Sequence, residues 1–436
     1  MAQFRKDTHE YLKDGKTIFE VVMLADQYGS LVGPSNPTGM AVDAFGRART
    51  STPFTLFDSF NRYQDNGKYS TANSAGGTFA FNSNTSTIDS TLTTTSSAYV
   101  YRETTRVFAY QPGKSLQILT TFIMNPAKAN LRQRVGYFGT DNGFYLERYD
   151  ASGIRFVKRS KVTGAVVNTP AEKTDWNIDK MDGTGPSGLT LNLDYPQIMF
   201  IDIEWLGLGT ARLGFVVNGA FIHCHSFHHS NLSDAPSGAY MQTACLPLRS
   251  EIENTGTTAS TSTLKKICET VISEGGYELR GRMRTAGMNT PTSNNYTLTS
   301  LNTYYPVCSI RLKSDRLDAV VVPKHIALVG TTASDYRYKI VTGADITGGT
   351  WVSAGSDSSV EFNINATSMS GGTELQSSYL ISTGSQSLTA TLEDGSFKFQ
   401  LERNSFTSTP SNFTIAVAAK ANNDKVLAGI DWEEVT

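Results

Sequence analysis

The chain of 436 residues has little cysteine, and its cysteines are widely spaced. Only four are present, at Cys224, Cys245, Cys268 and Cys308, and none belongs to a C-x-x-C pair. This spacing offers neither a disulfide framework nor a zinc ribbon. We predict reduced cysteines, packed as small apolar side chains in the cores of a protein made in the cytoplasm.

Charge and long apolar runs are also scarce. Charged residues make up 18% of the chain, with 38 basic against 40 acidic residues. Phosphate backbones are bound by clustered Lys and Arg, so this balance argues against nucleic acid as a partner. No apolar run approaches the roughly 20 residues of a membrane-spanning helix. The opening residues 1–6 have no apolar core of a signal peptide, so we expect no membrane partner either.

Motifs of common enzymes are missing as well. The sequence contains no G-x-S-x-G, no G-x-x-x-x-G-K-[ST] and no H-E-x-x-H. We therefore predict a protein that is not an enzyme, with no catalytic residues and no cofactor.

Residues that favour strands and turns fill the remaining composition. Thr and the aromatic residues fit a pleated surface, and the 37 glycines and many Asn residues fit turns. Asn218-Gly219 lies between strand-like segments 213–217 and 220–224, which predicts a tight hairpin. Similar hairpins are predicted around 141–143 and around Asp394-Gly395. One helix is predicted over 263–273, from the spacing of Leu264, Ile267, Cys268 and Val271.

Many short strands joined by turns predict an all-β chain, in three parts. Residues 1–50 form an N-terminal extended tether or docking segment, 51–290 a jelly-roll β-sandwich, and 300–436 a second β-domain. Residues 17–25 read as a lone strand, which either pairs outside its own domain or adds an edge strand to it. Residues 70–98 fit a loop or a pair of surface strands. In the second domain, Trp351 and Trp432 are expected to cap the core.

Four of the six histidines lie in the segment 223–229. On a regular strand His223 and His225 face the same side, and two imidazoles on one side can ligate a transition metal. If three chains meet at this strand, the pairs would enclose an axial ion. The alternative, which we favour, is a metal-free polar strand end.

Acidic residues give two further candidates. Asp202 and Glu204 are two residues apart, as a glycosidase acid pair on one strand would be. Because every strand brings such positions together, ion pairs with Arg212 or Arg249 are the preferred interpretation. Asp182 lies in the turn 182–188, which fits either Ca²⁺ binding or an Asx turn without metal. The Asx turn is the preferred alternative.

Several blocks of sequence carry a resemblance to a known family. They are residues 49–59, 176–188, 203–209, 214–215, 225–227, 272–277 and 431–434. Together these blocks resemble uncharacterised virion structural proteins of tailed bacteriophages, especially marine and cyanobacterial ones, over most of residues 41–436. The region 99–285 also resembles a concanavalin-type jelly roll, in which a strand with an aromatic such as Trp205 precedes a short Asn-Gly hairpin.

The resemblance implies a virion protein that forms a fibre, an appendage or a decoration on the head, neck or tail. It would assemble as a homotrimer and dock on other virion proteins. Two other classes stay open. One is a receptor-binding protein that recognises a host surface glycan through the jelly roll, and the other is a polysaccharide depolymerase that uses Asp202 and Glu204.

Overall fold

The computed structural model describes residues 10–13, 17–20, 52–232, 238–288, 295–383, 387–391 and 399–435. The chain divides into two compact units, Met1–Thr52 and Pro53–Thr436. In the first unit, β1 (Glu10–Lys13) pairs antiparallel with β2 (Thr17–Glu20), and Tyr11 lies opposite Phe19. The lone strand predicted over 17–25 therefore has a partner in its own chain, and its last five residues lie outside the described part.

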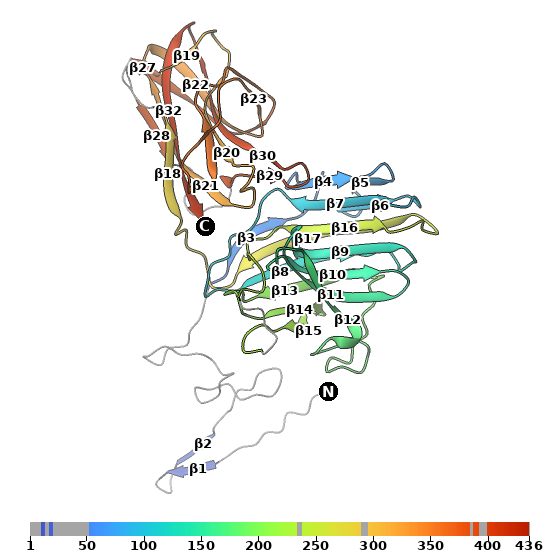
Figure 1. Cartoon of the computed structure of the whole chain (residues 1–436). Helices are drawn as coiled ribbons and strands as arrows, with labels where there is room; N and C mark the ends of the chain where they lie inside the picture. The colour runs from blue at the N-terminus through green and yellow to red at the C-terminus, as the bar shows by residue number, and fades with distance from the viewer. Residues whose placement is uncertain are drawn as a thin grey trace. The chain divides into compact units, whose positions relative to one another are not determined.

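Two sheets form the jelly roll of the second unit, drawn from blue to yellow in Figure 1. In the described residues the first sheet has seven strands, in the order β12 (Val167–Glu172), β11 (Gly153–Ser160), β10 (Gly143–Tyr149), β9 (Leu131–Phe138), β16 (Leu248–Asn254), β7 (Tyr99–Thr104) and β4 (Tyr69–Asn73). The second has β15 (Ala220–Phe227), β14 (Ala211–Val217), β13 (Gln197–Ile203), β8 (Leu116–Ile123), β17 (Ser262–Ser273), β6 (Thr87–Leu92) and β5 (Gly77–Asn82), with β3 (Phe54–Ser59) beside β17. Residues 70–98 thus supply strands, with β4 and β5 largely at the surface as in one of the two predicted alternatives, whereas β6 is largely buried.

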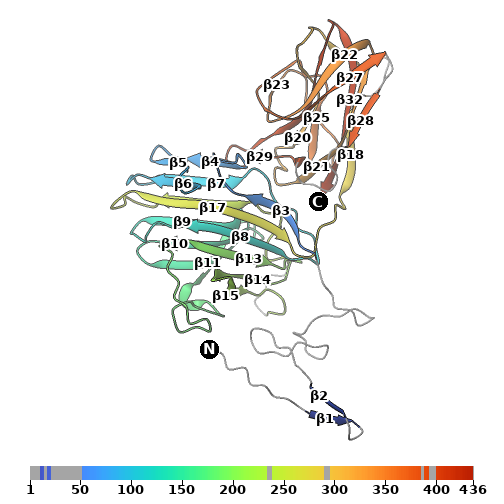
Figure 2. The same cartoon turned by 180° about the vertical axis from the view of Figure 1, so that it is seen from behind.

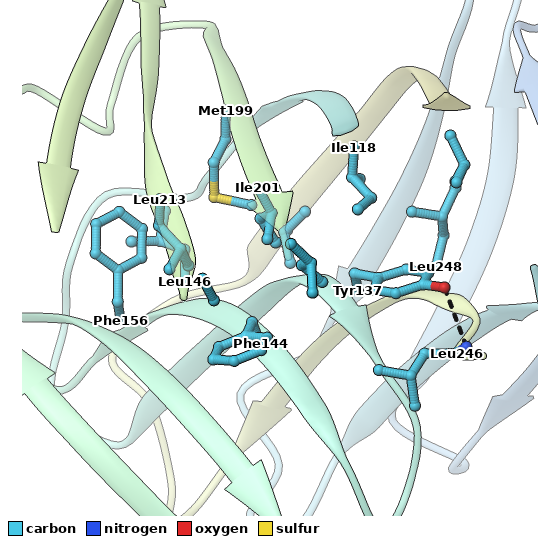
Figure 3. Close-up of a cluster of buried hydrophobic side chains, with 14 of the residues drawn as sticks. Ile118, Tyr137, Phe144, Leu146, Phe156, Met199, Ile201, Leu213, Leu246 and Leu248 are labelled. Atoms are coloured by element: carbon cyan, nitrogen blue, oxygen red, sulfur yellow. Dashed lines mark hydrogen bonds between the residues drawn. The ribbon is translucent and has the colours of Figure 1, made fainter. Parts of the chain in front are cut away.

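The core lies between these two sheets because their strands alternate. In β8, for example, every second residue from Leu116 to Phe122 is buried, while the residues that alternate with them are half-buried on the outer face. Figure 3 shows Ile118, Ile201 and Leu213 of one sheet facing Phe144 and Leu146 of the other. Tyr137 is also fully buried, and its hydroxyl accepts a hydrogen bond from the Leu246 amide at 3.1 Å. This apolar core between the two sheets therefore holds the jelly roll together.

The helix predicted over 263–273 is wrong, because this segment is the strand β17. Leu264 and Val271 are buried within an alternating pattern, and β17 pairs with β8, β6 and β3. The bulge at Ile267 and Cys268 shifts the alternation by one residue, so Leu264 and Val271 are both buried although they are seven residues apart, a spacing that resembles a helical face. The β-branched residues of this segment favour the strand.

Two further sheets contain the strands from β18 onward, drawn from yellow to red in Figure 2. In the described residues one has β18 (Arg282–Gly287), β32 (Asp424–Val435), β21 (Val320–Gly330) and β28 (Ser387–Thr391), with β19 (Tyr296–Leu298) beside β32. The other has β24 (Val352–Ser353), β25 (Val360–Asn363), β20 (Tyr305–Leu312), β31 (Asn412–Ala419), β22 (Ala333–Thr342) and β27 (Thr373–Thr383). Short pairs join β23 (Asp345–Thr347) to β26 (Ser368–Ser370) and β29 (Arg403–Asn404) to β30 (Thr409–Pro410). The all-β fold class is confirmed, whereas the predicted domain limits of 290 and 300 stay predictions.

Local predictions within these sheets had mixed outcomes. Asn218 and Gly219 both have positive φ in the turn between β14 and β15, which confirms the predicted hairpin. The turn at Asp394-Gly395 lies outside the described residues. Trp432 is fully buried, but Trp351 is only half-buried and does not belong to the core. Cys268 is exposed, so the expectation of a buried thiol is wrong there. No helix in the described ranges has the length and hydropathy needed to cross a bilayer.

Candidate functional site

A groove of about 630 Å³ opens on the outer face of the second jelly-roll sheet, and we call it the jelly-roll groove. Thr121 of β8, Ile198 of β13 and Val216 of β14 line it. Ile198 lies opposite Thr121, and Met199 and Phe215, the strand neighbours of Ile198 and Val216, are buried in the core. Strand alternation therefore turns the groove residues away from the core. The segment 189–197 supplies a further wall.

Tyr195 in this segment has 65% of its surface exposed, although it lines the groove. Hydrogen bonds within the loop stabilise its conformation. The side-chain amide of Gln197 donates through Nε2 to the backbone carbonyl oxygens of Asn192 at 2.7 Å and Tyr195 at 3.1 Å. An ion pair of 2.7 Å between Arg148 and Asp194 ties the same loop to β10. The phenol ring is therefore presented to solvent from a fixed loop.

The lining of the jelly-roll groove combines one exposed aromatic ring with many aliphatic side chains and several uncharged polar groups. Asn192, Gln197 and Asn218 contribute amides, and Thr121 and Thr190 contribute hydroxyls. Among the described lining residues there is no Asp, Glu, Lys, Arg or His. Such a surface offers hydrogen bonds in both directions without a formal charge, which suits a neutral polar ligand with one apolar face.

Cys268 also lines the jelly-roll groove, beside the bulge of β17. Its amide donates to Thr121 Oγ1 at 2.7 Å. Desolvation raises the pKa of the thiol above its ordinary value. The thiol therefore stays protonated at neutral pH, and this residue is not an activated nucleophile.

The outer face of the first jelly-roll sheet carries a network of buried ion pairs that the sequence analysis missed. Arg134 contacts Glu147 at 2.7 Å and Glu251 at 2.8 Å, and Arg249 contacts Glu103 at 2.6 Å and Glu251 at 2.7 Å. Burial alone would raise the pKa of Glu251, but Arg249 and Arg134 outweigh it and hold this pKa below its usual range. These carboxylates are committed to arginines, so they are unsuited to general acid catalysis. The spacing of Arg132 and Arg134, and of Glu251 and Glu253, was the available sequence signal.

Asp202 and Glu204 do not line the jelly-roll groove. Asp202 is half-buried on β13, where its carboxylate lies 3.5 Å from the exposed guanidinium of Arg212. Glu204 is exposed just beyond the end of β13. Burial, helped by the negative charges of Glu274 and Glu204, raises the pKa of Asp202 to about 6. Of the two predicted arginine partners, Arg212 contacts Asp202, whereas Arg249 belongs to the buried network.

We expect Asp202→Asn to raise the free energy of unfolding at pH 7 by about 1–2 kcal/mol. The folded carboxyl group binds its proton more tightly than the unfolded one, so stability falls as the pH rises from about 4 to about 6, and the loss is complete above pH 6. Part of that gain is offset by the loss of the Arg212 contact. Urea unfolding of the wild type and the variant at pH 4 and pH 7 measures this, and the gain should shrink at pH 4. A variant less stable than the wild type at pH 7 would contradict the prediction, and Glu204→Gln serves as the matched exposed control.

His223 and His225 do not share a face, because a bulge interrupts the pairing of β14 with β15. His225 lies opposite the buried Leu213, and its ring contacts Phe227 edge-on. His223 lies opposite Gly214, and its Nε2 is 2.9 Å from the hydroxyl of Ser226. The described residues contain no group of three or more His, Cys, Asp or Glu side chains placed to share a metal ion.

Asp182 forms an Asx turn, one of its two predicted alternatives. Its Oδ1 accepts hydrogen bonds from the amide of Thr184 at 2.9 Å and from its hydroxyl at 2.6 Å. These bonds lower the pKa of Asp182. The neighbouring carboxylate of Asp179 is buried and accepts from the amides of Met181 and Ser187, both at 2.8 Å. Both acids therefore stabilise the long turn.

No protein-family model matches the chain, and no curated protein matches its sequence. Solved structures with a similar fold include the carbohydrate recognition domain of Emp47p, at 11% identity over 51% of this chain and 95% of that chain, with a TM-score of 0.31. A GH16 of Bacteroides ovatus, in complex with a product, has 8% identity over 50% and 99% and a TM-score of 0.34. The CBM2 module of an evolved Dit from Lactobacillus casei BL23 phage J-1 has 8% identity over 53% and 100% and a TM-score of 0.33. Likenesses of this size carry no conclusion about function.

Proposed function

We propose that this chain is a non-enzymatic protein that binds neutral glycans through the jelly-roll groove. The observation that carries the proposal is the exposed ring of Tyr195 beside a mainly apolar groove that also carries amides and hydroxyls and has no charged side chain among its described lining residues. The C–H face of a sugar ring packs on an aromatic ring, and its hydroxyl groups both donate to and accept from amides. The groove volume of about 630 Å³ is that of a small-ligand site.

We further propose that the protein acts as part of a tailed-phage virion, where the glycan would belong to the host surface. The sequence blocks that resemble virion structural proteins support this setting. In this proposal the protein assembles with copies of itself, as a homotrimer, and docks on other virion proteins. Its role on the fibre, neck or tail is then recognition of the receptor.

The proposal predicts that Tyr195→Ala loses most of its glycan binding. Removing the ring removes the stacking surface, and we expect affinity to fall by about tenfold. Tyr195→Phe keeps the ring and should keep most of the affinity. A printed array of neutral oligosaccharides identifies a ligand, and titration calorimetry of that ligand with each variant measures the change.

Tyr63→Ala is the matched control, because Tyr63 is 82% exposed and does not line the jelly-roll groove. We expect this variant to bind as the wild type does. The proposal fails if no neutral oligosaccharide on the array binds, or if Tyr195→Ala binds as tightly as the wild type. Release of shortened oligosaccharides by the wild type would instead favour the depolymerase alternative.

A further inference from the structure

A second groove, of about 520 Å³, is built mainly from the later strands of the chain, and we call it the C-terminal groove. Its lining includes Arg311 of β20, Asp345 of β23, Trp351 from the chain after β23, and the segment 402–412. Ser70 of β4 and Thr105, which follows β7, complete it. None of its lining residues is shared with the jelly-roll groove.

Trp351 and Arg311 form a fixed pair in the C-terminal groove. The guanidinium carbon of Arg311 lies 4.0 Å from the centroid of the indole ring, a cation–π contact. Arg311 Nε donates to Glu361 Oε1 at 2.6 Å, which holds the guanidinium in place. In the described part of the chain no hydrogen bond joins its two Nη groups to a protein acceptor. The guanidinium covers one face of the half-buried indole, and the exposed remainder of the ring and these N–H groups are available to a ligand.

The other charged side chains of the C-terminal groove differ in whether they have partners. Glu402 lies 3.0 Å from Arg106, and Arg403 lies 2.7 Å from Glu103, so both are neutralised. Asp345 is exposed, and among the described residues its carboxylate has no ion pair or hydrogen bond. Arg311 is paired with Glu361 in the same way, so among the described lining residues Asp345 is the charged side chain without a partner.

This combination fits the chemistry of a neutral sugar ring. Adjacent hydroxyl groups donate hydrogen bonds to a carboxylate and accept them from a guanidinium, and such charge-assisted bonds are stronger than neutral ones. The apolar C–H face of the ring packs on an indole. The unpaired carboxylate of Asp345 would repel an anionic ligand, so an uncharged ligand is favoured over an anionic one.

We propose that the C-terminal groove is a second binding site for neutral saccharides, centred on Trp351 with Asp345 and Arg311 as hydrogen-bonding partners. The site is independent of the jelly-roll groove and shares with it only the ligand class. With two such sites on one chain, a polysaccharide that reaches both is held more tightly than one that reaches either.

The test is saturation-transfer NMR on the full chain with the methyl glycosides of glucose, galactose, mannose and N-acetylglucosamine. We use the Tyr195→Ala variant as the background, so that transfer reports on the C-terminal groove. At least one glycoside should show transfer in this background. Adding Trp351→Ala should reduce that transfer by about tenfold, and adding Asp345→Asn should reduce it as well.

Val352→Ala is the matched control, because Val352 is 48% exposed, follows Trp351 directly and does not line the groove. Trp351 is half-buried and outside the core, so its removal should leave the circular dichroism spectrum and the melting temperature nearly unchanged. The inference is overturned if the Tyr195→Ala background shows no transfer from any of the four glycosides, or if Trp351→Ala leaves the transfer intact. Neither result bears on glycan binding at the jelly-roll groove, because that binding is tested separately by comparing the wild type with Tyr195→Ala.

Discussion

Replacing Arg403 with alanine is expected to lower the free energy of unfolding by about 3–5 kcal/mol. The side chain of Arg403 is 2% exposed, and it lies 2.7 Å from Glu103, whose side chain is equally buried. Arg403 also contacts Asp318 at 2.9 Å. Removing the guanidinium leaves Glu103 buried, with Arg249 as its one remaining charged partner among the described residues. A buried charge that loses a partner costs far more than an exposed ion pair contributes.

Arg403 also joins parts of the chain that are far apart in sequence. It lies on β29, whereas Glu103 lies on β7 of the jelly roll, and Gln400 Nε2 donates to the Val107 carbonyl nearby at 2.9 Å. Urea unfolding followed by fluorescence and by circular dichroism measures both the loss and its cooperativity. We expect the transitions seen by the two probes to separate in Arg403→Ala.

The control for Arg403 is an exposed ion pair in the same unit. Lys420 lies 2.9 Å from Asp335, and both side chains are more than half exposed. Lys420→Ala should therefore change the free energy of unfolding by less than about 1 kcal/mol. A loss of that small size in Arg403→Ala would show that the buried pair does not hold the fold.

Acidification from pH 7 to pH 4.5 is expected to destabilise the jelly roll by several kcal/mol through His225 and His229. Both residues are buried, at 8% and 3% exposure, and burial lowers the pKa of each to about 4. An unfolded histidine has a pKa near 6.5. Between pH 6.5 and pH 4 the unfolded chain therefore binds protons at these two residues, whereas the folded chain does not. Stability is therefore complete above pH 6.5 and is lost as the pH falls towards 4, by about 2 kcal/mol per residue at pH 4.5.

The surroundings of His229 explain why a proton is costly there. Its Nδ1 lies 2.7 Å from the carbonyl oxygen of Gly209, so Nδ1 carries the hydrogen of the neutral ring. Its ring stacks on Tyr240 at 3.6 Å between centroids, and among the described residues Nε2 has no hydrogen-bond partner. A second proton would thus place an unpaired charge in the interior.

Urea unfolding at half-unit steps between pH 7 and pH 4 tests this prediction. The double variant His225→Gln/His229→Gln should lose most of the slope between pH 6.5 and pH 4.5. His228, which is exposed, supplies the control His228→Gln, which should keep the slope. If the double variant keeps the wild-type slope, the acid sensitivity arises elsewhere.

Local sequence determined the features that depend on neighbouring residues alone. The Asn218-Gly219 hairpin was predictable because a two-residue turn needs positive φ at both positions, and Asn and Gly adopt it readily. The all-β class was predictable from turn residues and alternation in the same way. The strand β17 was mistaken for a helix because its bulge is set by the pairing with β8, which is distant in sequence.

The two grooves were decided by the tertiary structure alone. The jelly-roll groove brings together Thr121, the segment 189–198, the turn at Asn218 and Cys268, which no sequence spacing connects. The same holds for Arg403 and Glu103, whose 300-residue separation hides a buried ion pair. His223 and His225 show the opposite case. Their sequence spacing placed them on one face of a strand, but a bulge in the structure puts them on different faces. Sequence patterns fix which face of a strand is apolar, whereas the strand order and register fix which residues meet, because those depend on how distant segments bury their apolar faces together.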